Sequence, residues 1–341
     1  MESEYSYHKQ LTLYNFTAFA NISLDFTSGI NIFIGENGTG KTHIMKALYA
    51  WQLARHLAAY SSTGDYANIF TRTYGVKELQ LLYRNKTKTA SVSGNYGDAN
   101  WQIGLQNGIA VDNGIRPNTP RPVFIPAMEM MAHARNMNGI LRDYADFDRT
   151  YFDFLSMVTA TPSTSFKHDL ILDLKGLSEL YSGDTEWNEE DQMFYLQDKN
   201  RRLPYALVAE GIRKVTGLTR LIENNWLSHG GVLFWDEPEV NLNPRWMGEI
   251  IEVLVMLALQ KIQIFVATHN YVIIKQLELS LRKYHLSGND TPAVRYFSLS
   301  KSNNKSKVTW SDDYSDLEPN PILDQYDIML AEDLELGNQG F

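Results

Sequence analysis

The spacing of hydrophobic positions changes along the first sixty residues and predicts the first elements of the chain. Between residues 10 and 26, apolar and polar positions alternate with a period of two, which predicts an antiparallel hairpin. Residues 32–34 form a continuous apolar run that is typical of a short buried strand. Apolar positions at helical spacing follow it and predict a helix at about 41–60. The chain therefore enters a glycine-rich loop from a buried strand and leaves it through a helix.

The second half shows the same succession of buried strand and helix. Apolar runs at 231–235 and 262–267 predict buried strands, followed by helices at about 244–260 and up to Tyr284. Residues 128–199 are rich in methionine, aromatic and charged residues and predict a mostly helical insertion. The other predicted elements are strands at 79–83, 90–92, 101–105, 122–126, 293–299 and 307–310, helices at 207–227 and 321–336, and loops at 61–74 and 107–122.

Composition narrows the class of protein. The chain has 341 residues, enough for one large domain or two, and no cysteine. The lack of cysteine excludes a disulfide framework, a thiol nucleophile and a cysteine-zinc site. The start has no basic segment followed by an apolar core, and the longest apolar runs are too short to cross a bilayer. We therefore expect a cytoplasmic protein with no membrane partner.

Charge is distributed unevenly. The net charge of −9 argues against a surface that is basic overall. Residues 311–341 hold nine Asp or Glu and no Lys or Arg, which is typical of a solvated face and otherwise of a contact for a basic partner. The densest basic stretch predicts a solvated face, support for a neighbouring subunit, or a nucleic-acid contact. It consists of Lys199, Arg201, Arg202, Arg213, Lys214 and Arg220.

The loop after the first buried strand carries the clearest motif. Its spacing Gly35-x-x-x-x-Gly40-Lys41-Thr42 matches the phosphate-loop pattern, in which glycines let backbone N–H groups point at phosphate oxygens. Lys41 would contact the β- and γ-phosphates, and Thr42 would bind Mg²⁺. The alternative is a glycine-rich turn that binds nothing. The predicted ATP contacts are Gly35, Glu36, Asn37, Gly38, Thr39, Gly40, Lys41, Thr42 and His43.

Four motifs in a fixed order resemble the ATP-binding-cassette ATPases. They are Leu13-Tyr14-Asn15-Phe16, Gly35–Thr42, Val232–Glu239 and Ala267–Asn270. The chain most resembles the soluble branch that includes SMC and RecF-type heads and the small AAA-type ATPases of OLD-like and Septu-type phage-defence systems. The resemblance implies an α/β fold, an ABC-ATPase head (P-loop NTPase) with an antiparallel β subdomain and a helical insertion. It implies an N-terminal ATPase lobe at 1–127, the insertion at 128–200 and a C-terminal ATPase lobe at 201–341.

The same resemblance assigns catalytic and metal-binding roles. Asp236 would hold Mg²⁺ through a water molecule, with Thr42 as a ligand, because a buried carboxylate needs such a cation to be tolerated. Glu237 would act as general base toward the attacking water, and Lys41 would take up charge on the transferred phosphoryl group. His269 resembles the switch histidine that contacts the γ-phosphate. The alternatives are a capping or salt-bridge role for the two acids and a structural role for the histidine.

The resemblance also implies a homodimer, because in this family ATP lies between two heads. The second head contributes the start of the helix after its signature, which is here Ala209-Glu210-Gly211. Ala209 replaces the serine that would donate to the γ-phosphate, and Glu210 would repel phosphate unless it points away. Backbone N–H groups and the helix dipole near Gly211 could supply part of the contact. The loop Glu239–Asn243 would meet the partner subunit near its nucleotide.

The resemblance implies two further assignments. Family members often have a glutamine after the strand at 122–126, and this chain offers Glu129 there as a Mg²⁺ ligand. An aromatic ring from the first hairpin would stack on adenine. Tyr14, Phe16 and Phe19 are the candidates, and the sequence does not rank them.

Together with the nucleotide-site motifs, the resemblance implies an ATPase that dimerises on ATP and acts as a switch or sensor for a separate effector, a nuclease or toxin, in bacterial anti-phage defence. Too few residues follow His269 for the TOPRIM nuclease domain of OLD proteins, and no HNH-like histidine cluster is present. Nucleic acid is a possible partner through such a complex. The alternatives are a RecF-like DNA-repair head acting directly on DNA, a transporter nucleotide-binding subunit, and a scaffold that binds nucleotide without turnover.

Overall fold

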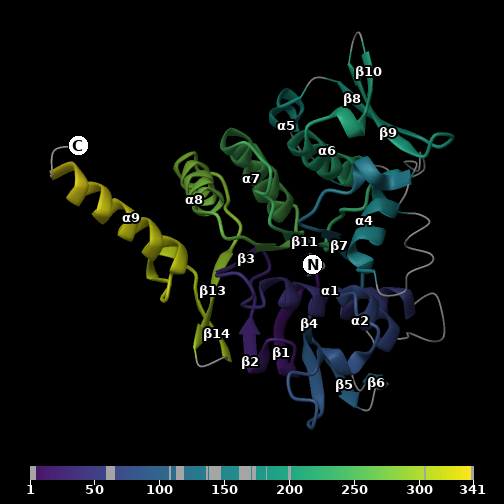
Figure 1. Ribbon diagram of the computed structural model, residues 1–341, viewed down its shortest axis with the longest axis vertical. Coiled ribbons are helices and arrows are strands. Elements are labelled where there is room, and N and C mark those ends of the chain that lie inside the picture. Colours follow the sequence, from purple (N-terminus) through teal and green to yellow (C-terminus); the bar gives the residue numbers. More distant parts are fainter. Residues whose placement is uncertain are drawn as a thin grey trace.

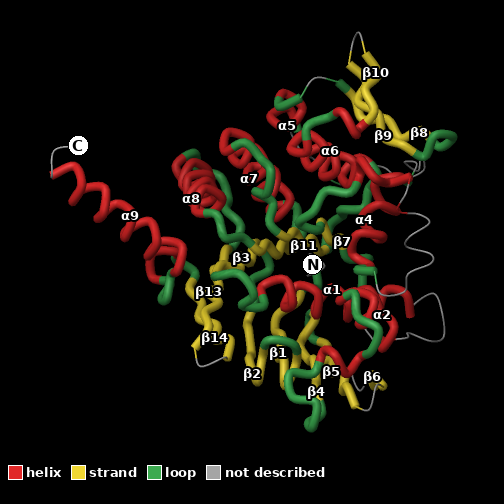
Figure 2. Tube along the Cα trace, viewed as in Figure 1, coloured by secondary structure: helices red, strands yellow, loops and turns green. Residues whose placement is uncertain are grey.

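A six-stranded sheet lies at the centre of the molecule, with helices and a second sheet packed on its faces (Figures 1 and 2). Its strand order is β14-β13-β3-β12-β11-β7, and all neighbours are parallel except β14, which pairs antiparallel with β13. Its strands are β3 (Ile30–Gly35), β7 (Val123–Ile125), β11 (Val232–Asp236), β12 (Gln263–Ala267), β13 (Val294–Ser302) and β14 (Lys305–Ser311). The computed structural model describes residues 5–58, 66–106, 109–112, 119–135, 137, 147–160, 170, 174–181, 183–198, 201–302 and 305–338.

Both faces of the central sheet are covered. Successive side chains of a strand point to opposite faces, so Ile32 lies in one hydrophobic core and Phe33 in the other. Burial on both faces explains why these strands read as continuous apolar runs. The α-helices around the sheet are α1 (Lys41–Ala58), α2 (Tyr66–Tyr74), α4 (Arg149–Thr159), α5 (Lys175–Glu179), α6 (Glu210–Glu223), α7 (Pro244–Leu259), α8 (Tyr271–Leu286) and α9 (Pro321–Asn338). Helices α4, α6, α7 and α8 contribute to the first core, and α1 and α2 contribute to the second.

An antiparallel sheet with the order β2-β1-β4-β5-β6 covers the second core. The predicted first hairpin is confirmed, since Leu13 pairs with Ile22 across β1 and β2. The strands of this sheet are β1 (His8–Phe16), β2 (Phe19–Asp25), β4 (Ala90–Tyr96), β5 (Ala99–Gln106) and β6 (Ile109–Asp112). Its inward-facing residues lie against α1, the helix that follows the glycine-rich loop.

A small three-stranded sheet, β10-β9-β8, stands at the edge of the molecule near α5 and α6 (Figure 1). Its strands are β8 (Asp184–Asn188), β9 (Met193–Asp198) and β10 (Arg201–Pro204). The prediction of a mostly helical insertion did not include it, and the sheet crosses the proposed boundary at residue 200. The division into segments 1–127, 128–200 and 201–341 stays a prediction, and part of the middle segment lies outside the described residues.

Three local predictions are wrong. The predicted loop at 61–74 contains helix α2, whose Ile69 and Phe70 are buried although the surrounding residues are polar. Residues 61–65 lie outside the described part. The predicted strand at 79–83 is a 3₁₀ helix, because Leu79 and Leu82, three positions apart, point into the core together. The predicted loop at 107–122 contains the short strand β6, and its residues 107–108 and 113–118 lie outside the described part.

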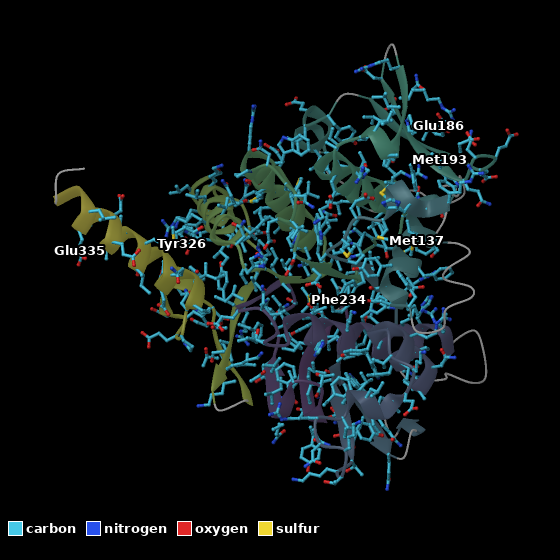
Figure 3. All side chains as sticks on the ribbon, viewed as in Figure 1. Met137, Glu186, Met193, Phe234, Tyr326 and Glu335 are labelled. Carbon is cyan, nitrogen blue, oxygen red and sulfur yellow. The ribbon has the colours of Figure 1, made fainter. Side chains whose placement is uncertain are left out.

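The C-terminal helix α9 extends away from the rest of the molecule (Figure 1). Figure 3 labels Tyr326 and Glu335 along it, with their side chains clear of the sheet. The remaining short elements are the 3₁₀ helices η1 (Leu79–Leu82), η2 (Met131–His133), η3 (Tyr205–Leu207) and η4 (Tyr314–Asp316). In the described ranges no helix is long and apolar enough to cross a membrane.

Candidate nucleotide-binding site

The glycine-rich loop joins β3 to α1 at the carboxyl edge of the central sheet. Gly35 and Gly40 have φ angles of 141° and 108°, in the region that favours glycine. A Cβ atom on Gly35 would lie 2.2 Å from the carbonyl oxygen of Leu299, and one on Gly40 would lie 2.5 Å from the Cζ of Phe19. Both positions therefore require glycine, and the loop leads directly into the N-terminus of α1, where backbone N–H groups favour an anion.

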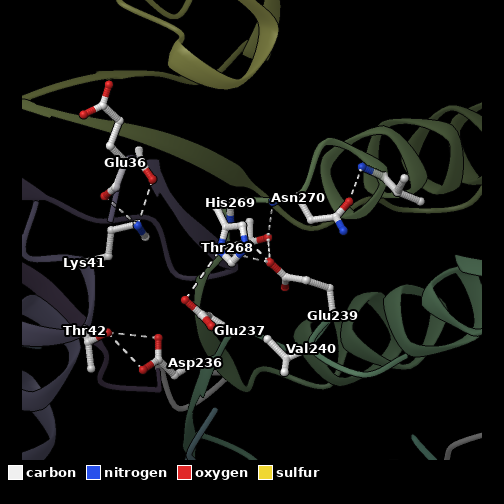
Figure 4. A network of polar contacts seen from close by, with 12 residues as sticks. Glu36, Lys41, Thr42, Asp236, Glu237, Glu239, Val240, Thr268, His269 and Asn270 are labelled. Atoms are coloured by element: carbon white, nitrogen blue, oxygen red, sulfur yellow. Dashed lines mark hydrogen bonds and ion pairs between the residues drawn. The ribbon is translucent and has the colours of Figure 1, made fainter. Parts of the chain in front are cut away.

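Lys41 lies across this loop. Its Nζ donates to the carbonyl oxygens of Gly35 at 2.8 Å and Glu36 at 3.1 Å (Figure 4). Thr39 Oγ1 donates to the same Glu36 carbonyl at 2.8 Å. Burial lowers the pKa of the Lys41 ammonium, and nearby carboxylates act in the opposite direction. A cation held inside a glycine-rich loop is the arrangement that binds the β- and γ-phosphates of a nucleotide.

The other loop residues divide into exposed and packed positions. Residues 36–38 are exposed at the tip of the loop. His43 is turned into the protein, with its ring 5.6 Å from that of Tyr74, and burial lowers its pKa to about 4. The hydroxyl of Tyr74 donates to the His43 carbonyl at 2.6 Å. The His43 side chain is therefore used in packing, which leaves its backbone for any phosphate contact.

Thr42 and Asp236 form the candidate metal site. Thr42 Oγ1 lies 3.1 Å from Oδ1 and 2.9 Å from Oδ2 of Asp236 (Figure 4). Asp236 is 9% exposed, and burial raises the pKa of its carboxyl to about 6. Hydroxyl and carboxylate oxygens are ligands that Mg²⁺ prefers, and a cation would relieve the cost of burying this carboxylate. These residues therefore fit Mg²⁺.

Mg²⁺ needs few protein ligands when substrate phosphates complete its coordination. The described residues contain no cluster of three or more His, Cys, Asp or Glu arranged to hold a metal ion. The Thr42–Asp236 pair is thus the candidate that the geometry offers.

Glu237 and His269 follow the ends of two adjacent parallel strands. Glu237 Oε1 lies 3.4 Å from His269 Nδ1, and the two side chains are 29% and 46% exposed. Glu237 has a positive φ of 48°, and its N–H donates to the carbonyl of Ala267 at 2.9 Å. This backbone conformation, unusual for glutamate, turns the chain sharply at the strand end. The result is an accessible carboxylate beside the phosphate loop and the histidine.

A second carboxylate, Glu239, fixes the loop that carries the histidine. Its Oε1 accepts from Thr268 Oγ1 at 2.6 Å and from the His269 N–H at 3.2 Å. The side chain is 3% exposed, and Oε2 is buried with no hydrogen-bond partner among the described residues. The sequence reasoning gave Glu239 only a place in the loop toward a second subunit. Its contact with Thr268 depends on the pairing of β11 with β12, which no spacing reveals.

Lys214, on α6, reaches the same loop from the other side. Its Nζ donates to the carbonyl oxygens of Glu237 at 3.1 Å and Val240 at 3.0 Å. Lys214 is 3% exposed, and burial lowers the pKa of its ammonium. The sequence placed this lysine only in a basic stretch, so its role at the site was missed.

Other members of the basic stretch also have structural partners. Arg202 pairs with Glu186, Arg213 with Glu129, and Arg220 donates to the carbonyl of Val158. Arg201 is exposed, and Lys199 lies outside the described residues. These partners leave few of the described basic side chains available for nucleic acid.

Two predicted site segments lie elsewhere. Glu129 is 2% exposed, its Oε2 is 2.6 Å from Arg213 Nε, and its Oε1 accepts from the Met131 N–H. Because both oxygens have partners away from Asp236, we leave Glu129 out of the metal site that we propose. The segment Ala209-Glu210-Gly211 opens α6, and a Cβ atom on Gly211 would lie 3.1 Å from the carbonyl oxygen of Asn241. Its contact with the nucleotide of a second head stays a prediction.

The structure separates the three aromatic candidates for stacking on adenine. Phe16 and Phe19 are 0% exposed, whereas Tyr14 is 41% exposed. Of the three, Tyr14 presents its ring to solvent, and the adenine contact stays a prediction for it.

Two family models match the chain. Residues 104–275 match the model described as "AAA domain, putative AbiEii toxin, Type IV TA system". Residues 9–62 match the model described as "AAA ATPase domain". Between them they cover the phosphate loop, the strand end at Asp236 and the strand end at His269.

The curated relatives match over short stretches. The DNA replication and repair protein RecF of Pediococcus pentosaceus is 34% identical over 88 residues, which are 26% of this chain and 19% of that protein. RecF proteins of Enterococcus faecalis and Cytophaga hutchinsonii match similarly, so the chain spans 16% to 25% of the length of these relatives.

Solved structures resemble the whole chain. The Smc head bound to the C-winged helix domain of ScpA has a TM-score of 0.54 at 14% identity, covering 91% of this chain and 98% of that one. The Pyrococcus furiosus Smc head bound to the C-terminal domain of ScpA has a TM-score of 0.56 at 12% identity, covering 96% and 99%. The predicted α/β ATPase-head fold is therefore confirmed.

Proposed function

We propose, from the premise that this chain belongs to the AAA-domain family matched over residues 104–275, that it binds ATP with Mg²⁺ and hydrolyses it. Its fold is that of an SMC/RecF-type ATPase head. One observation carries the proposal. The loops after β3, β11 and β12 bring Lys41, the Thr42–Asp236 pair and the Glu237–His269 pair to one edge of the sheet.

Register explains this convergence. Asp236 pairs with Ala267, and Ala267 pairs with Phe33, so the three strand ends lie at the same level. Ligands of open α/β sheets bind at the carboxyl ends of the strands. Residues nearly two hundred positions apart in the sequence thus face one nucleotide.

Each residue has a role in this proposal. Lys41 turns from its loop carbonyls to the phosphates, and Thr42 and Asp236 hold Mg²⁺, which when bound neutralises charge on the phosphate oxygens. Glu237 would orient a water molecule and accept its proton as the water attacks the terminal phosphorus, while the bond from that phosphorus to the bridging oxygen of the β-phosphate breaks and ADP leaves with that oxygen. His269, positioned by Glu239, donates a hydrogen bond toward the oxygens of the same phosphoryl group.

We further propose that two heads close over two nucleotides. The segment Ala209-Glu210-Gly211 of one head would meet the nucleotide of the other through the N-terminus of α6. Hydrolysis then reopens the pair. Lys214 connects α6 to the loop at Glu237. It would therefore couple the contact between the two heads to hydrolysis.

The switch would act on a separate effector, a nuclease or toxin, in bacterial anti-phage defence. The family description, which names a toxin of a type IV system, supports a role of this class. A RecF-like head that acts directly on DNA is the second candidate, and the match to RecF proteins favours it. The structural partners of Arg202, Arg213 and Arg220 speak against a DNA contact at that stretch.

The first test replaces Glu237 with glutamine. Glu237→Gln keeps the shape of the side chain but cannot accept a proton, so phosphate release should fall by a factor of about 100 or more. The variant should bind ATP with Mg²⁺ as the wild type does and should accumulate as an ATP-bound dimer. Phosphate release and sedimentation velocity, with and without ATP, measure both effects.

Lys41→Ala serves as the matched control, because it should abolish nucleotide binding together with any association that depends on ATP. A Glu237→Gln variant that hydrolyses ATP at the wild-type rate would contradict the assigned base. Wild-type protein that binds ATP without turnover would contradict the proposed hydrolysis and support the alternative of a scaffold that binds nucleotide. Salt-sensitive, ATP-dependent binding to duplex DNA would favour the second candidate over the effector switch.

A further inference from the structure

Helix α9 has an apolar face that nothing in the described structure covers. Every residue from Asp324 to Gly337 is exposed. Its start packs on the body, where Ile322 is 7% exposed and the ring centroids of Tyr326 and Tyr271, at the beginning of α8, lie 5.0 Å apart. An isolated helix of this length is marginal in water, because most helical stability comes from packing of an apolar face. Packing of its apolar face against another surface would therefore stabilise this helix.

The helix is amphipathic and acidic. At 3.6 residues per turn, one side carries large apolar residues that are 46% to 60% exposed, namely Tyr326, Met329, Leu330 and Leu334. The opposite side carries Asp324, Glu332 and Glu335 together with the exposed Ile328, whereas Asp333 lies within the apolar side and Asp327 beside it. There is no Lys or Arg in the helix. A surface that fits this helix must be apolar and carry positive charge.

The same chain offers such a surface at the end of α8. A groove of about 490 Å³ lies between the last turns of α8 and the segment before β13. Its lining includes Leu281, Arg282, His285, Leu286, Pro292 and Val294. Leu286 is 85% exposed, so it adds an accessible apolar side chain to the groove.

The charge of the groove is complementary to α9. Arg282 has no recorded ion pair among the described residues. The groove also contains Asp312, but Arg295 neutralises it through two hydrogen bonds of 2.6 and 2.9 Å. Lys283, which is exposed beside Arg282 on α8, adds a second positive charge.

We propose that α9 of one copy of this chain docks into the α8 groove of a second copy, and that the second copy returns the contact. Such reciprocal contacts form a two-fold symmetric dimer. The apolar side of α9 would lie in the groove, and Asp327 and Asp333, which lie on or beside that side of the helix, would face Arg282 and Lys283.

This contact would be separate from the nucleotide site. Val294 pairs with Ile30 at the start of β3, whereas Leu299 pairs with Gly35 at its end. The groove therefore lies toward the amino edge of the central sheet, opposite the phosphate loop. The inference does not depend on the proposed ATPase function, and it is tested without nucleotide.

The experiment mixes two full-length variants. The first, Leu330→Asp with Leu334→Asp, damages α9 and keeps the groove. The second, Arg282→Glu with Leu286→Asp, damages the groove and keeps α9. All four residues are exposed, so neither variant should unfold, which circular dichroism checks. Leu81→Asp, at an exposed position on η1, is the matched control.

Sedimentation velocity without nucleotide should show a dimer for the wild type and for Leu81→Asp. Each damaged variant alone should associate at least about a hundredfold more weakly, because charged groups would enter an apolar contact. Their mixture should regain a heterodimer, since one α9 and one groove remain intact in that pair. Higher salt should weaken the wild-type dimer.

A wild type that is monomeric without nucleotide would overturn the proposal, whether α9 then binds its own groove or a different protein. So would a damaged variant that dimerises as the wild type does. A mixture that stays monomeric would show that α9 and the groove are not partners.

Discussion

The backbone of Glu237 is held in a left-handed conformation by neighbours from two sides. Its N–H donates to Ala267 on β12, and its carbonyl accepts from Lys214 on α6. A positive φ in a non-glycine residue costs free energy, about 1–3 kcal/mol, and persists where the surroundings fix it. The position of the carboxylate that we propose as the base therefore depends on Lys214.

The first prediction concerns this lysine. Lys214→Met keeps the buried stem and removes the ammonium, so the Val240 carbonyl loses the donor Nζ and the Glu237 carbonyl keeps only the N–H of Val240 at 3.2 Å among the bonds described. We expect turnover to fall about tenfold or more, because a loop that is free to shift misplaces the base. Affinity for ATP should change little, since the phosphate loop is untouched. Phosphate release gives the first quantity, and equilibrium binding of a fluorescent nucleotide gives the second.

Lys275→Met is the control, because this lysine is 42% exposed on α8 and forms an ion pair with Glu278 on the same helix. It should leave both quantities unchanged. Equal losses of turnover and of ATP affinity in Lys214→Met would indicate general unfolding and contradict a positioning role.

At this scale the sequence predicts the residues that are defined by a motif. The spacing from Gly35 to Thr42 was sufficient to locate the loop. The partners of Glu239 and Lys214 were not predictable, because their contacts join β11 to β12 and α6 to a distant loop. The residue type of a lysine on a helix does not reveal whether its side chain is buried or exposed to solvent.

Among the elements, α1 and α4 are connected directly. Asp148 caps α4, accepting from Thr150 N–H at 2.9 Å and Oγ1 at 2.7 Å, and its other oxygen pairs with Lys46 of α1. Tyr49 of α1 also donates to Asp153 of α4 at 2.6 Å. Because α1 begins at the phosphate loop, these contacts offer a route from the nucleotide to the segment that we predict as an insertion.

The second prediction concerns the cap. Asp148→Ala removes both the cap and the ion pair and should lower the free energy of unfolding by about 1–3 kcal/mol. Asp148→Asn keeps a capping oxygen and should cost less. Urea unfolding monitored by circular dichroism measures both values.

A double-mutant cycle with Lys46→Met separates the two effects. If Asp148→Ala costs the same with and without Lys46, the ion pair contributes nothing and α1 is not coupled to α4 through it.

Whole elements were predicted best where the pattern was strong. The first hairpin and the buried strands β11 and β12 were predicted correctly because each has a clear period or a continuous apolar run. Helix α2 was missed because only a few of its residues face the core, and the sheet β8-β9-β10 was missed because its strands are short and partly exposed. The local sequence pattern does not specify which distant segments pair, as β3 does with β13.

For the molecule as a whole, two histidines link stability to pH, the buried His8 and the partly buried His43. His8 lies among aromatic rings in the second core, 5.5 Å from Trp51 and 5.1 Å from Tyr96, and its Nε2 bonds to Gln52 at 2.8 Å. Burial lowers its pKa to about 4. Burial also lowers the pKa of His43 to about 4, and Lys46 acts in the same direction. Both histidines are therefore neutral in the folded protein at physiological pH.

The last prediction follows from the difference between the histidine pKa in the folded protein and in the unfolded chain. In the unfolded chain a histidine binds a proton near pH 6.5, whereas the folded protein resists protonation down to about pH 4. The unfolded state then binds more protons, so stability falls as pH falls through this window and is unaffected by these groups above it. Each histidine should account for a loss of about 3 kcal/mol at pH 4.

Urea unfolding from pH 8 down to pH 4.5 should show this decline in stability, and His8→Leu should make the decline smaller. His285→Gln, at an exposed position on α8, should not, and an unchanged slope in His8→Leu would show that this buried ring is not its source.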